Sequence, residues 1–341
     1  MDTIPGKLLG GNLETARKAY ATFRGIPLDW DLAAAAPAPT PRRLRRTIGR
    51  GISVRGPGTF FGKSIRTITF EPSTQPGWWF ERTDLGDTLP FAVSARNVWT
   101  TGDMVSNIVL RAGPPHNYVR MVEHIIAFKP GLGLDDLRIR IDSGDPPLFV
   151  RGSLDLADAL TEAGIVECAA PVRYVTVTEP VCICDNRGAL VALAPADPAR
   201  PELRLDCAVD FPTAIGRQRL RYTMNPIHFR LGAEARTNTS YSKMLYCRTI
   251  GRLFADVRNL GYTSANILIA GKHDYKNEPR LLHEGKSLEA IWHRAALDLP
   301  AALALVEEGQ FVGDVLSYRA GHTLDVRLIC RLYRQGLLKM W

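Results

Sequence analysis

The sequence predicts an α+β protein of two similar domains, each a β-sheet with helices, in which the helices are sandwiched between the two sheets. Its 341 residues are enough for two domains by the usual length of a domain. Each half of the chain places a set of strands before a helix, a further strand and another helix, which suggests a duplicated α+β unit. Helices packed between two sheets would bury the apolar faces of both.

The predicted units are an N-terminal extension with an Ala/Pro linker and two domains, with the boundaries 1–42, 43–168 and 169–341. Within the extension, apolar residues at helical spacing predict a helix over 13–23, with Asn12 as its cap and Gly25 after its end. The stretch AAAAPAPTP at 33–41 has the composition of a linker. We therefore interpret the extension as a segment that could dock a protein partner.

Strands and helices alternate with turn residues in both domains. In the first domain, runs rich in β-branched and aromatic residues predict strands at 65–70, 78–81, 91–93, 108–110 and 137–141. Apolar residues at helical spacing predict helices at about 119–128 and 153–163. The same patterns in the second domain predict strands at 173–178, 188–193, 203–210, 267–270 and 310–317. They predict helices near 242–259, 287–306 and 322–336.

The charge of the chain is strongly positive, with a formal net charge of +8 at pH 7. This admits an anionic partner such as nucleic acid, a phosphorylated substrate or a membrane surface. The run PRRLRR at 41–46 holds four arginines and is either a solvated linker end or a binding patch. No aromatic platform or known binding motif accompanies the charge, which disfavours nucleic acid as the partner.

The chain is predicted to be cytoplasmic. It has no run of about 18 apolar residues that would form a transmembrane segment. Its first residues, MDTIPGKLLGG, lack the basic start and long apolar centre of a signal peptide. Six cysteines at scattered spacings are typical of reduced thiols in a cytosolic protein.

The segment 121–136, MVEHIIAFKPGLGLDD, places the carboxylate of Glu123 beside the imidazole of His124. A Glu next to a His can set a general base beside a metal ligand. His293 and His322 fall in or at the start of predicted helices of the second half, so the three imidazoles could converge where the halves meet. A histidine on a helix is more often a hydrogen-bonded structural residue than a ligand, so histidines alone are weak evidence.

Several ordered segments carry a family resemblance: GWWFERTDLGD, MVEHIIAFKPGLGLDD, VDFPTAIGRQ, CRTIG at 247–251 and YRAGHTLDVRLICRL at 318–332. In these, CRTIG resembles the family pattern Ala-Arg-Thr-Phe-Gly. From about residue 43 to 341, the chain resembles the zinc-dependent UDP-3-O-acyl-N-acetylglucosamine deacetylases (LpxC) of lipid A biosynthesis. The resemblance implies an amide hydrolase with Zn²⁺ as cofactor and an acylated amino-sugar nucleotide as substrate.

The resemblance implies a role for each of nine residues: catalytic Glu123, His322, Thr249 and Arg294; substrate-binding Arg319 and Gly321; and metal-binding His124, His293 and Asp298. Glu123 would take the proton of the attacking water. His322, as imidazolium, would stabilise the oxyanion or protonate the leaving amine. Thr249 would donate a hydrogen bond to the tetrahedral intermediate.

The spacing of the third metal ligand departs from the family pattern. The family has H-x3-D, which places both ligands on one face of a helix. Here Asp298 follows His293 by five residues, which is about 140° around an ideal helix. A kink at Pro300, or a one-residue π-bulge, would return Asp298 towards the metal.

Three further departures surround the expected site. Arg294 stands where the family has Lys, Arg151 stands near a family Asp, and the Asp that orients the catalytic histidine has no match in 300–303. Two hypotheses follow. The chain is a zinc-dependent deacetylase, with an altered substrate as one form of this hypothesis, or it is a non-catalytic paralogue that uses the old cleft to bind a ligand or a protein partner.

Overall fold

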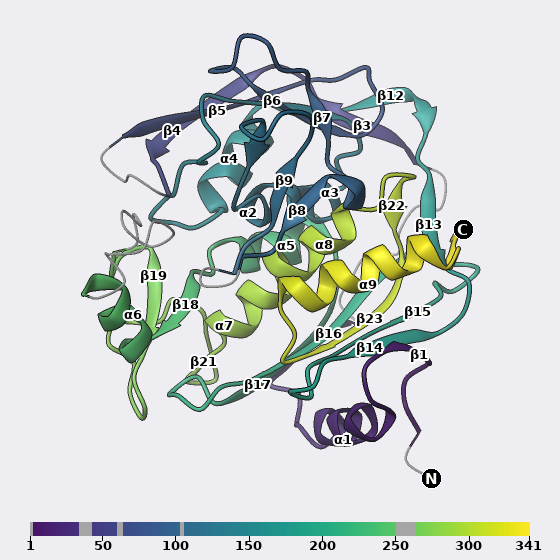
Figure 1. The fold of residues 1–341 in the computed structure, drawn as a ribbon, viewed down its shortest axis with the longest axis vertical. Coiled ribbons are helices and arrows are strands. Elements are labelled where there is room, and N and C mark those ends of the chain that lie inside the picture. Colours follow the sequence, from purple (N-terminus) through teal and green to yellow (C-terminus); the bar gives the residue numbers. More distant parts are fainter. Residues whose placement is uncertain (1–2, 34–42, 60–63, 103–105, 250–262) are drawn as a thin grey trace.

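The computed structural model describes two β-sheets with a layer of helices between them (Figure 1). This confirms the predicted α+β class and the predicted sandwich. The described residues are 3–33, 43–59, 64–102, 106–249 and 263–341. No helix in these ranges combines the length and the apolar character that a membrane span requires.

The first sheet has five strands in the order β4-β5-β11-β6-β7. Their bounds are β4 Ile52–Pro57, β5 Ile65–Glu71, β11 Leu137–Ile141, β6 Trp78–Arg82 and β7 Phe91–Ala92. Alternate side chains of β5, Ile68 and Phe70, are fully buried, as a sheet with one covered face requires. A separate two-stranded ladder pairs β3 with β12, which span Leu44–Ile48 and Ile165–Pro171.

The second sheet has seven strands in the order β1-β14-β15-β23-β16-β17-β2. Their bounds are β1 Lys7–Gly10, β14 Val181–Cys184, β15 Leu190–Ala194, β23 Gly313–Tyr318, β16 Leu203–Asp210, β17 Arg217–Thr223 and β2 Trp30–Leu32. The strand expected at 310–317 is divided, because Phe311 ends one strand and Gly313, at φ +138°, begins β23. Positive φ at this position favours glycine.

The N-terminal extension packs on the second sheet rather than standing apart from it. Strand β1 pairs with β14 at one edge, and β2 pairs with β17 at the other. Helix α1, Leu13–Arg24, lies on the outer face of this sheet, with the expected Asn12 cap accepting hydrogen bonds from the backbone of Glu14 and Thr15. Phe23, Ala16 and Ala19 are buried there in one cluster with Cys182, Cys184 and Tyr318. The described part of the extension therefore belongs to the fold of the second half.

The middle layer consists of short helices whose apolar side chains share one core with both sheets. It contains α2 Glu123–Ile126, α3 Phe128–Leu132, α4 Leu154–Glu162, α5 Pro226–Ala233, α7 Glu289–Trp292, the π-helix η4 His293–Asp298, α8 Leu299–Ala304 and α9 His322–Arg334. The helix expected over 119–128 is shorter, because Tyr118–Val119 forms the strand β10. The helix expected over 287–306 is present as α7, η4 and α8 in succession.

Small sheets complete the fold. The three-stranded sheets are β10-β9-β8 and β22-β13-β24, with the remaining strands at β9 Val109–Arg111, β8 Val98–Thr100, β22 Gln310–Phe311, β13 Tyr174–Val177 and β24 Leu338–Met340. Two-stranded pairs are formed by β18 Thr237–Ser240 with β19 Ile267–Ala270, and by β20 Leu282–His283 with β21 Lys286–Ser287. Helix α6, Tyr241–Arg248, follows β18, and the later part of the helix expected over 242–259 lies outside the described residues.

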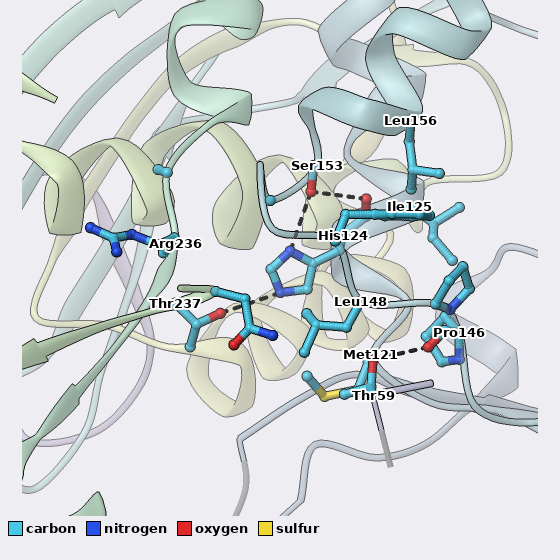
Figure 2. Close-up of a pocket in the computed structure, with 15 residues that line it drawn as sticks. Thr59, Met121, His124, Ile125, Pro146, Leu148, Ser153, Leu156, Arg236 and Thr237 are labelled. Atoms are coloured by element: carbon cyan, nitrogen blue, oxygen red, sulfur yellow. Dashed lines mark hydrogen bonds between the residues drawn. The ribbon is translucent and has the colours of Figure 1, made fainter. Parts of the chain in front are cut away.

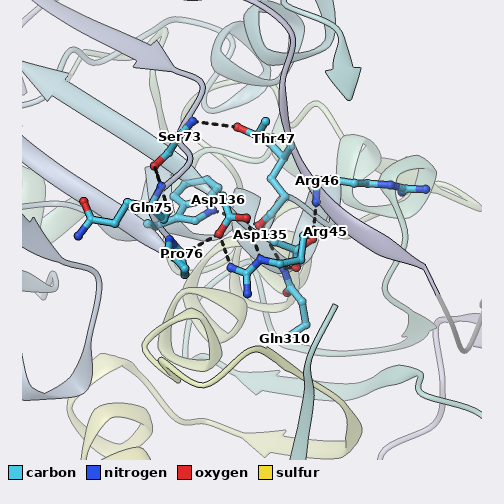
Figure 3. Close-up of polar contacts among 12 residues, drawn as sticks. Arg45, Arg46, Thr47, Ser73, Gln75, Pro76, Asp135, Asp136 and Gln310 are labelled. Carbon is cyan, nitrogen blue, oxygen red and sulfur yellow. Dashed lines mark hydrogen bonds and ion pairs between the residues drawn. The ribbon is translucent and has the colours of Figure 1, made fainter. Parts of the chain in front are cut away.

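Two arginines of the PRRLRR run form ion pairs inside the fold. Arg45 Nε donates to Asp136 Oδ2 at 2.8 Å (Figure 3). Arg43 Nη1 lies 2.5 Å from Asp135 Oδ2. Gln310, from the second half of the chain, donates to Asp135 Oδ1 at 3.0 Å. Asp135 therefore connects the arginine segment to Gln310 of the second half, a contact that the charge count did not reveal.

Lys129 links the halves at the end of helix α8. Its Nζ is buried and donates to the carbonyl oxygens of Ala304 and Val306, at 3.0 and 2.7 Å. The last carbonyls of a helix have no partner within the helix, so this ammonium satisfies two groups that the fold would otherwise leave buried and unpaired. Burial lowers the pKa of Lys129 to about 8.

The lowered pKa of Lys129 predicts a pH-dependent stability. The folded protein releases this proton near pH 8, whereas an unfolded lysine keeps it until about pH 10.4. Between these values the unfolded chain binds more protons, so raising the pH favours folding. From pH 8 to 10, the free energy of unfolding of the wild type should rise by about 2 kcal/mol relative to Lys129→Met. Urea unfolding measures this, with exposed Lys339→Met as the control. A constant difference between wild type and Lys129→Met contradicts the prediction.

Candidate functional site

The structure brings Glu123 and three histidines together between the sheets. Glu123 and His124 begin helix α2, His293 begins η4, and His322 is the first residue of α9. Glu123 Oε2 accepts the backbone N–H of Ile108 at 2.9 Å, and Oε1 lies 3.8 Å from His322 Nε2. Segments nearly 200 residues apart thus meet at one buried point, as the spacing of motifs predicted.

Two imidazoles face a common hydroxyl group. Thr237, the first residue of β18, places its Oγ1 3.5 Å from His124 Nε2 (Figure 2). The same Oγ1 lies 3.0 Å from His293 Nε2. The two rings lie 5.3 Å apart between centroids. The Nδ1 atom of His124 lies 3.3 Å from the hydroxyl of Ser153. The second nitrogen of His124 is thus held, which fixes the direction of Nε2.

The π-helix η4 places Asp298 beside two of the histidines. Its hydrogen bonds run from residue i to i+5, so residues five apart lie on one face. Asp298 Oδ1 lies 3.3 Å from His293 Nδ1 and 3.5 Å from His322 Nε2. Pro300 then stands in the first turn of α8, a position that proline tolerates. Of the two alternatives, a kink at Pro300 or a π-bulge, the structure contains a π-helix, and it returns Asp298 to the side of His293.

The electrostatics of the cluster follow from burial and from these contacts. Burial raises the pKa of the Glu123 carboxyl, and His322 offsets part of that effect. Burial, together with the neighbouring His293, lowers the pKa of His124 to about 3, so this ring is neutral at physiological pH. Burial opposes the charged forms of His293 and Asp298, but their mutual attraction outweighs it. The pKa of His293 is therefore raised, and that of Asp298 lowered.

Among the described residues, the hydrogen bonds of the Arg294 side chain go to Asp325 and Ser317 and not to the histidines. Its guanidinium donates to both carboxylate oxygens of Asp325, at 2.5 and 2.6 Å, and to the hydroxyl of Ser317 at 2.9 and 3.2 Å. All three side chains are buried. A planar fork that makes a bidentate bond to a carboxylate has few donors left for a substrate. The arginine expected to be catalytic is thus engaged within the fold.

Thr249 lies at the exposed end of α6, and the structure does not bring it to the cluster. Its hydroxyl donates to the carbonyl of Leu245 in the preceding helical turn, at 2.8 Å. Thr237 stands beside the histidines instead. The sequence carried a signal for it, because residues 235–237 read Ala-Arg-Thr, the opening of the family pattern that CRTIG at 247–251 only partly matches.

A buried ion pair fixes the strand that carries Thr237. Arg236 Nε and Nη2 lie 2.6 and 3.0 Å from the two carboxylate oxygens of Glu289, in helix α7. The backbone N–H of Arg236 donates to the same carboxylate. Glu289 lies one turn before His293, so this pair ties Thr237 to the helix that presents His293.

An apolar pocket adjoins His124 and Thr237 (Figure 2). The lining includes residues of the segment 146–153, which departs from the family pattern near Arg151. Its apolar side chains include Met121, Pro146, Leu148, Phe149 and Leu156. Arg151, which stands near the family Asp, is exposed and pairs with Asp155 and Asp158 of helix α4. The expected substrate-binding residues Arg319 and Gly321 are exposed just before α9, with Arg319 at φ +53°.

The donor set suits zinc, although its arrangement is incomplete. Two imidazole nitrogens and a carboxylate are typical zinc ligands. His124 and His293 direct Nε2 towards one point, and Asp298 Oδ1 is buried with no hydrogen-bond partner among the described residues. In the part of the chain that the structure describes, no group of three or more His, Cys, Asp or Glu side chains is arranged to hold a metal ion as it stands. Asp298 approaches His293 from the Nδ1 side, so its side chain must turn to join the other two donors.

Buried acid–base groups with displaced pKa values, one of which, His124, lines an apolar pocket, are typical of the active site of an enzyme. The model of the family of UDP-3-O-acyl N-acetylglycosamine deacetylases matches residues 45–334, and the chain belongs to this family. The N-terminal extension precedes the matched region.

Individual relatives are distant but cover most of the chain. A UDP-3-O-acyl-N-acetylglucosamine deacetylase of Solibacter usitatus (strain Ellin6076) is 25% identical, over 85% of this chain and 91% of its own length. One from Thermosynechococcus vestitus is 28% identical, over 89% of this chain and 99% of its own length. One from a Psychrobacter species is also 28% identical, over 85% of this chain.

Proposed function

We propose that this protein is a zinc-dependent amide hydrolase that removes an acyl group from the amino group of an acylated amino-sugar nucleotide. The observation that carries the proposal is the convergence of Glu123, His124, His293, Asp298 and His322 beside an apolar pocket. Membership of the deacetylase family and the names of the relatives supply the substrate class. The positive net charge suits a substrate that carries a diphosphate.

His124, His293 and Asp298 are the residues that would hold the metal. His124 and His293 would bind through Nε2, the atoms that face Thr237. Bound there, Zn²⁺ would supply Lewis-acid stabilisation of the negative charge that develops on the amide oxygen. Neutral His124 needs no deprotonation before it binds, because its pKa lies near 3.

The remaining groups of the site move protons and orient the reacting atoms. Glu123 Oε1 is placed to accept a proton from the attacking water, and its raised pKa makes it a better base than an ordinary carboxylate. His322 Nε2, 3.8 Å from that oxygen, is placed to donate a proton to the leaving amine. The Thr237 hydroxyl can donate a hydrogen bond to the developing oxyanion, the role first expected of Thr249. Arg319 remains a candidate contact for the anionic part of the substrate.

A non-catalytic paralogue that binds a ligand in the old cleft is the second candidate. The position of Asp298 on the Nδ1 side of His293 favours it, because a missing third ligand would weaken metal binding. The engagement of Arg294 by Asp325 points the same way. Metal content and activity separate the two functions.

The test measures zinc in protein purified without chelator. If the protein is the proposed hydrolase, it should carry about one zinc per chain. The variant His293→Ala should carry less than about 0.2, because two protein ligands bind zinc too weakly to keep it through purification. The control is His273→Ala, an exposed histidine outside the cluster. Release of free amine from UDP-3-O-acyl-N-acetylglucosamine then measures activity. Wild-type protein with less than about 0.2 zinc per chain and no amine release would refute the hydrolase and leave the binding function.

A further inference from the structure

We propose that Arg294 and Asp325 form a positioning pair that holds the helix carrying His322 against the helix carrying His293. The inference rests on the proposed hydrolase function for its activity readout. Arg294 directly follows His293 in η4, and Asp325 lies three residues after His322 in α9. Residues three apart share a helix face, so the ion pair joins the two helices at the level of the site.

The pair reaches three elements at once. The Arg294 guanidinium bonds both oxygens of Asp325, at 2.5 and 2.6 Å, and it bonds Ser317 at the end of strand β23. Ser317 is fully buried and lies five residues before His322. The entry of the chain into α9 is thus fixed on one side by Ser317 and on the other by Asp325.

His322 has no side-chain partner of its own that would orient it through Nδ1. That atom is buried and makes no hydrogen bond among the described residues. A catalytic or metal-bound imidazole usually has its second nitrogen held by a carboxylate or carbonyl group. Because that bond is missing, the place of His322 Nε2 near Glu123 and Asp298 depends on where the first turn of α9 lies. The Arg294–Asp325 pair is one of the contacts that set this position, together with the Thr101–Thr323 hydrogen bond of 2.8 Å in the same turn.

The energetics of a buried ion pair also indicate that the Arg294–Asp325 pair contributes to positioning rather than to stability. A buried ion pair loses about as much from desolvation as it gains from attraction, and apolar replacement of both partners is often neutral or stabilising. The bidentate bond, by contrast, fixes both distance and angle between its partners. Positioning errors of about 1 Å can cost on the order of 10²-fold in rate.

The test replaces both partners, as Arg294→Met with Asp325→Leu, in the full-length protein. We expect the double variant to keep its thermal midpoint and its zinc, while kcat falls by about 10²-fold and KM changes little. The same double change at a second arginine–carboxylate pair, Arg219→Met with Asp206→Leu on the outer face of the sheet, is the matched control and should keep kcat. A folded, zinc-loaded double variant with wild-type kcat would overturn the proposal.

A second readout does not depend on activity. Modification of His322 by diethylpyrocarbonate, followed by peptide mass spectrometry, should be faster in the double variant than in the wild type and unchanged in the control. Unchanged labelling of His322 would refute the positioning role even if the wild type proved inactive. Should the double variant fail to fold, Arg294→Lys tests the same proposal, because lysine keeps the positive charge but cannot make the bidentate bond to Asp325. It should fold and show lower kcat with faster labelling, and wild-type values of both would overturn the proposal.

Discussion

Replacing Glu123 with glutamine is expected to lower kcat by about 10²- to 10⁴-fold while zinc stays bound. Glutamine has nearly the same shape, and its amide oxygen can still accept the backbone N–H of Ile108. It cannot take a proton from water at neutral pH, so the variant removes the base and little else. Glu123 is not a metal ligand in the proposed site, which is why metal content should not change.

Amine release under saturating substrate and zinc analysis of the same samples measure the two parts of this prediction. The control is Glu179→Gln, which changes an exposed glutamate that pairs with Lys7 far from the cluster. If Glu123→Gln turns over at the wild-type rate, another group is the base. Loss of zinc together with activity would instead show that Glu123 supports the metal, contrary to the role proposed here.

Replacing Glu289 with glutamine is expected to lower the free energy of unfolding by about 3–5 kcal/mol. Glu289 is completely buried and accepts bonds from the Arg236 side chain and from the backbone of Arg236 and Arg280. The variant keeps an acceptor oxygen but leaves the Arg236 charge in the interior without its counter-ion. An unpaired buried charge is among the few defects that cost this much.

Urea unfolding at neutral pH measures the loss. Glu14→Gln is the matched control, because Glu14 also forms an ion pair, with Lys18 one turn along α1, but at the surface. Exposed pairs of this kind contribute little to stability, so the control should change little. Equal effects of the two substitutions would mean that the Arg236–Glu289 pair is solvated and does not fix the strand that carries Thr237.

Local patterns predicted much of the fold. The Asn12 cap and the spacing of apolar residues predicted α1 within one residue, and helical spacing also predicted α4 and α9. Runs rich in β-branched and aromatic residues predicted β5 and β11 closely. These elements were predictable because their signals lie within a few residues of each other.

Features that depend on distant pairing were not predictable in the same way. The strand at 174–177 was expected, but its place in a small sheet with β22 and β24 follows from pairing with the other end of the chain. The N-terminal extension was interpreted as a segment that could dock a protein partner, and its two short strands occupy opposite edges of the second sheet. Strands of three or four residues carry little pattern, and an open sheet edge supplies the hydrogen bonds that define them.

The residues of the candidate site fall into the same two groups, those that local sequence predicted and those that only the tertiary structure placed. Glu123 and His124 were predictable as a pair because they are adjacent, and His293 and His322 because they lie in recognisable motifs. Thr249 was selected from one matching tripeptide, whereas Thr237, in another, is the threonine that reaches the histidines. The tripeptide at 235–237 matches the family's Ala-Arg-Thr, whereas that at 247–249 begins with Cys, so the sequence offered a signal for Thr237. Only the path of β18 shows that this threonine faces His293.

The sequence by itself determined the class of fold, the order of the motifs and the identity of the buried glutamate and imidazoles. Only the tertiary structure decided the partners of Asp298 and Arg294. The π-helix that turns Asp298 towards His293 and His322 arises where one extra residue must fit into a helix packed on all sides. Arg294 bonds Asp325 because packing brings η4 and α9 side by side, and no local pattern encodes that contact between residues 31 positions apart.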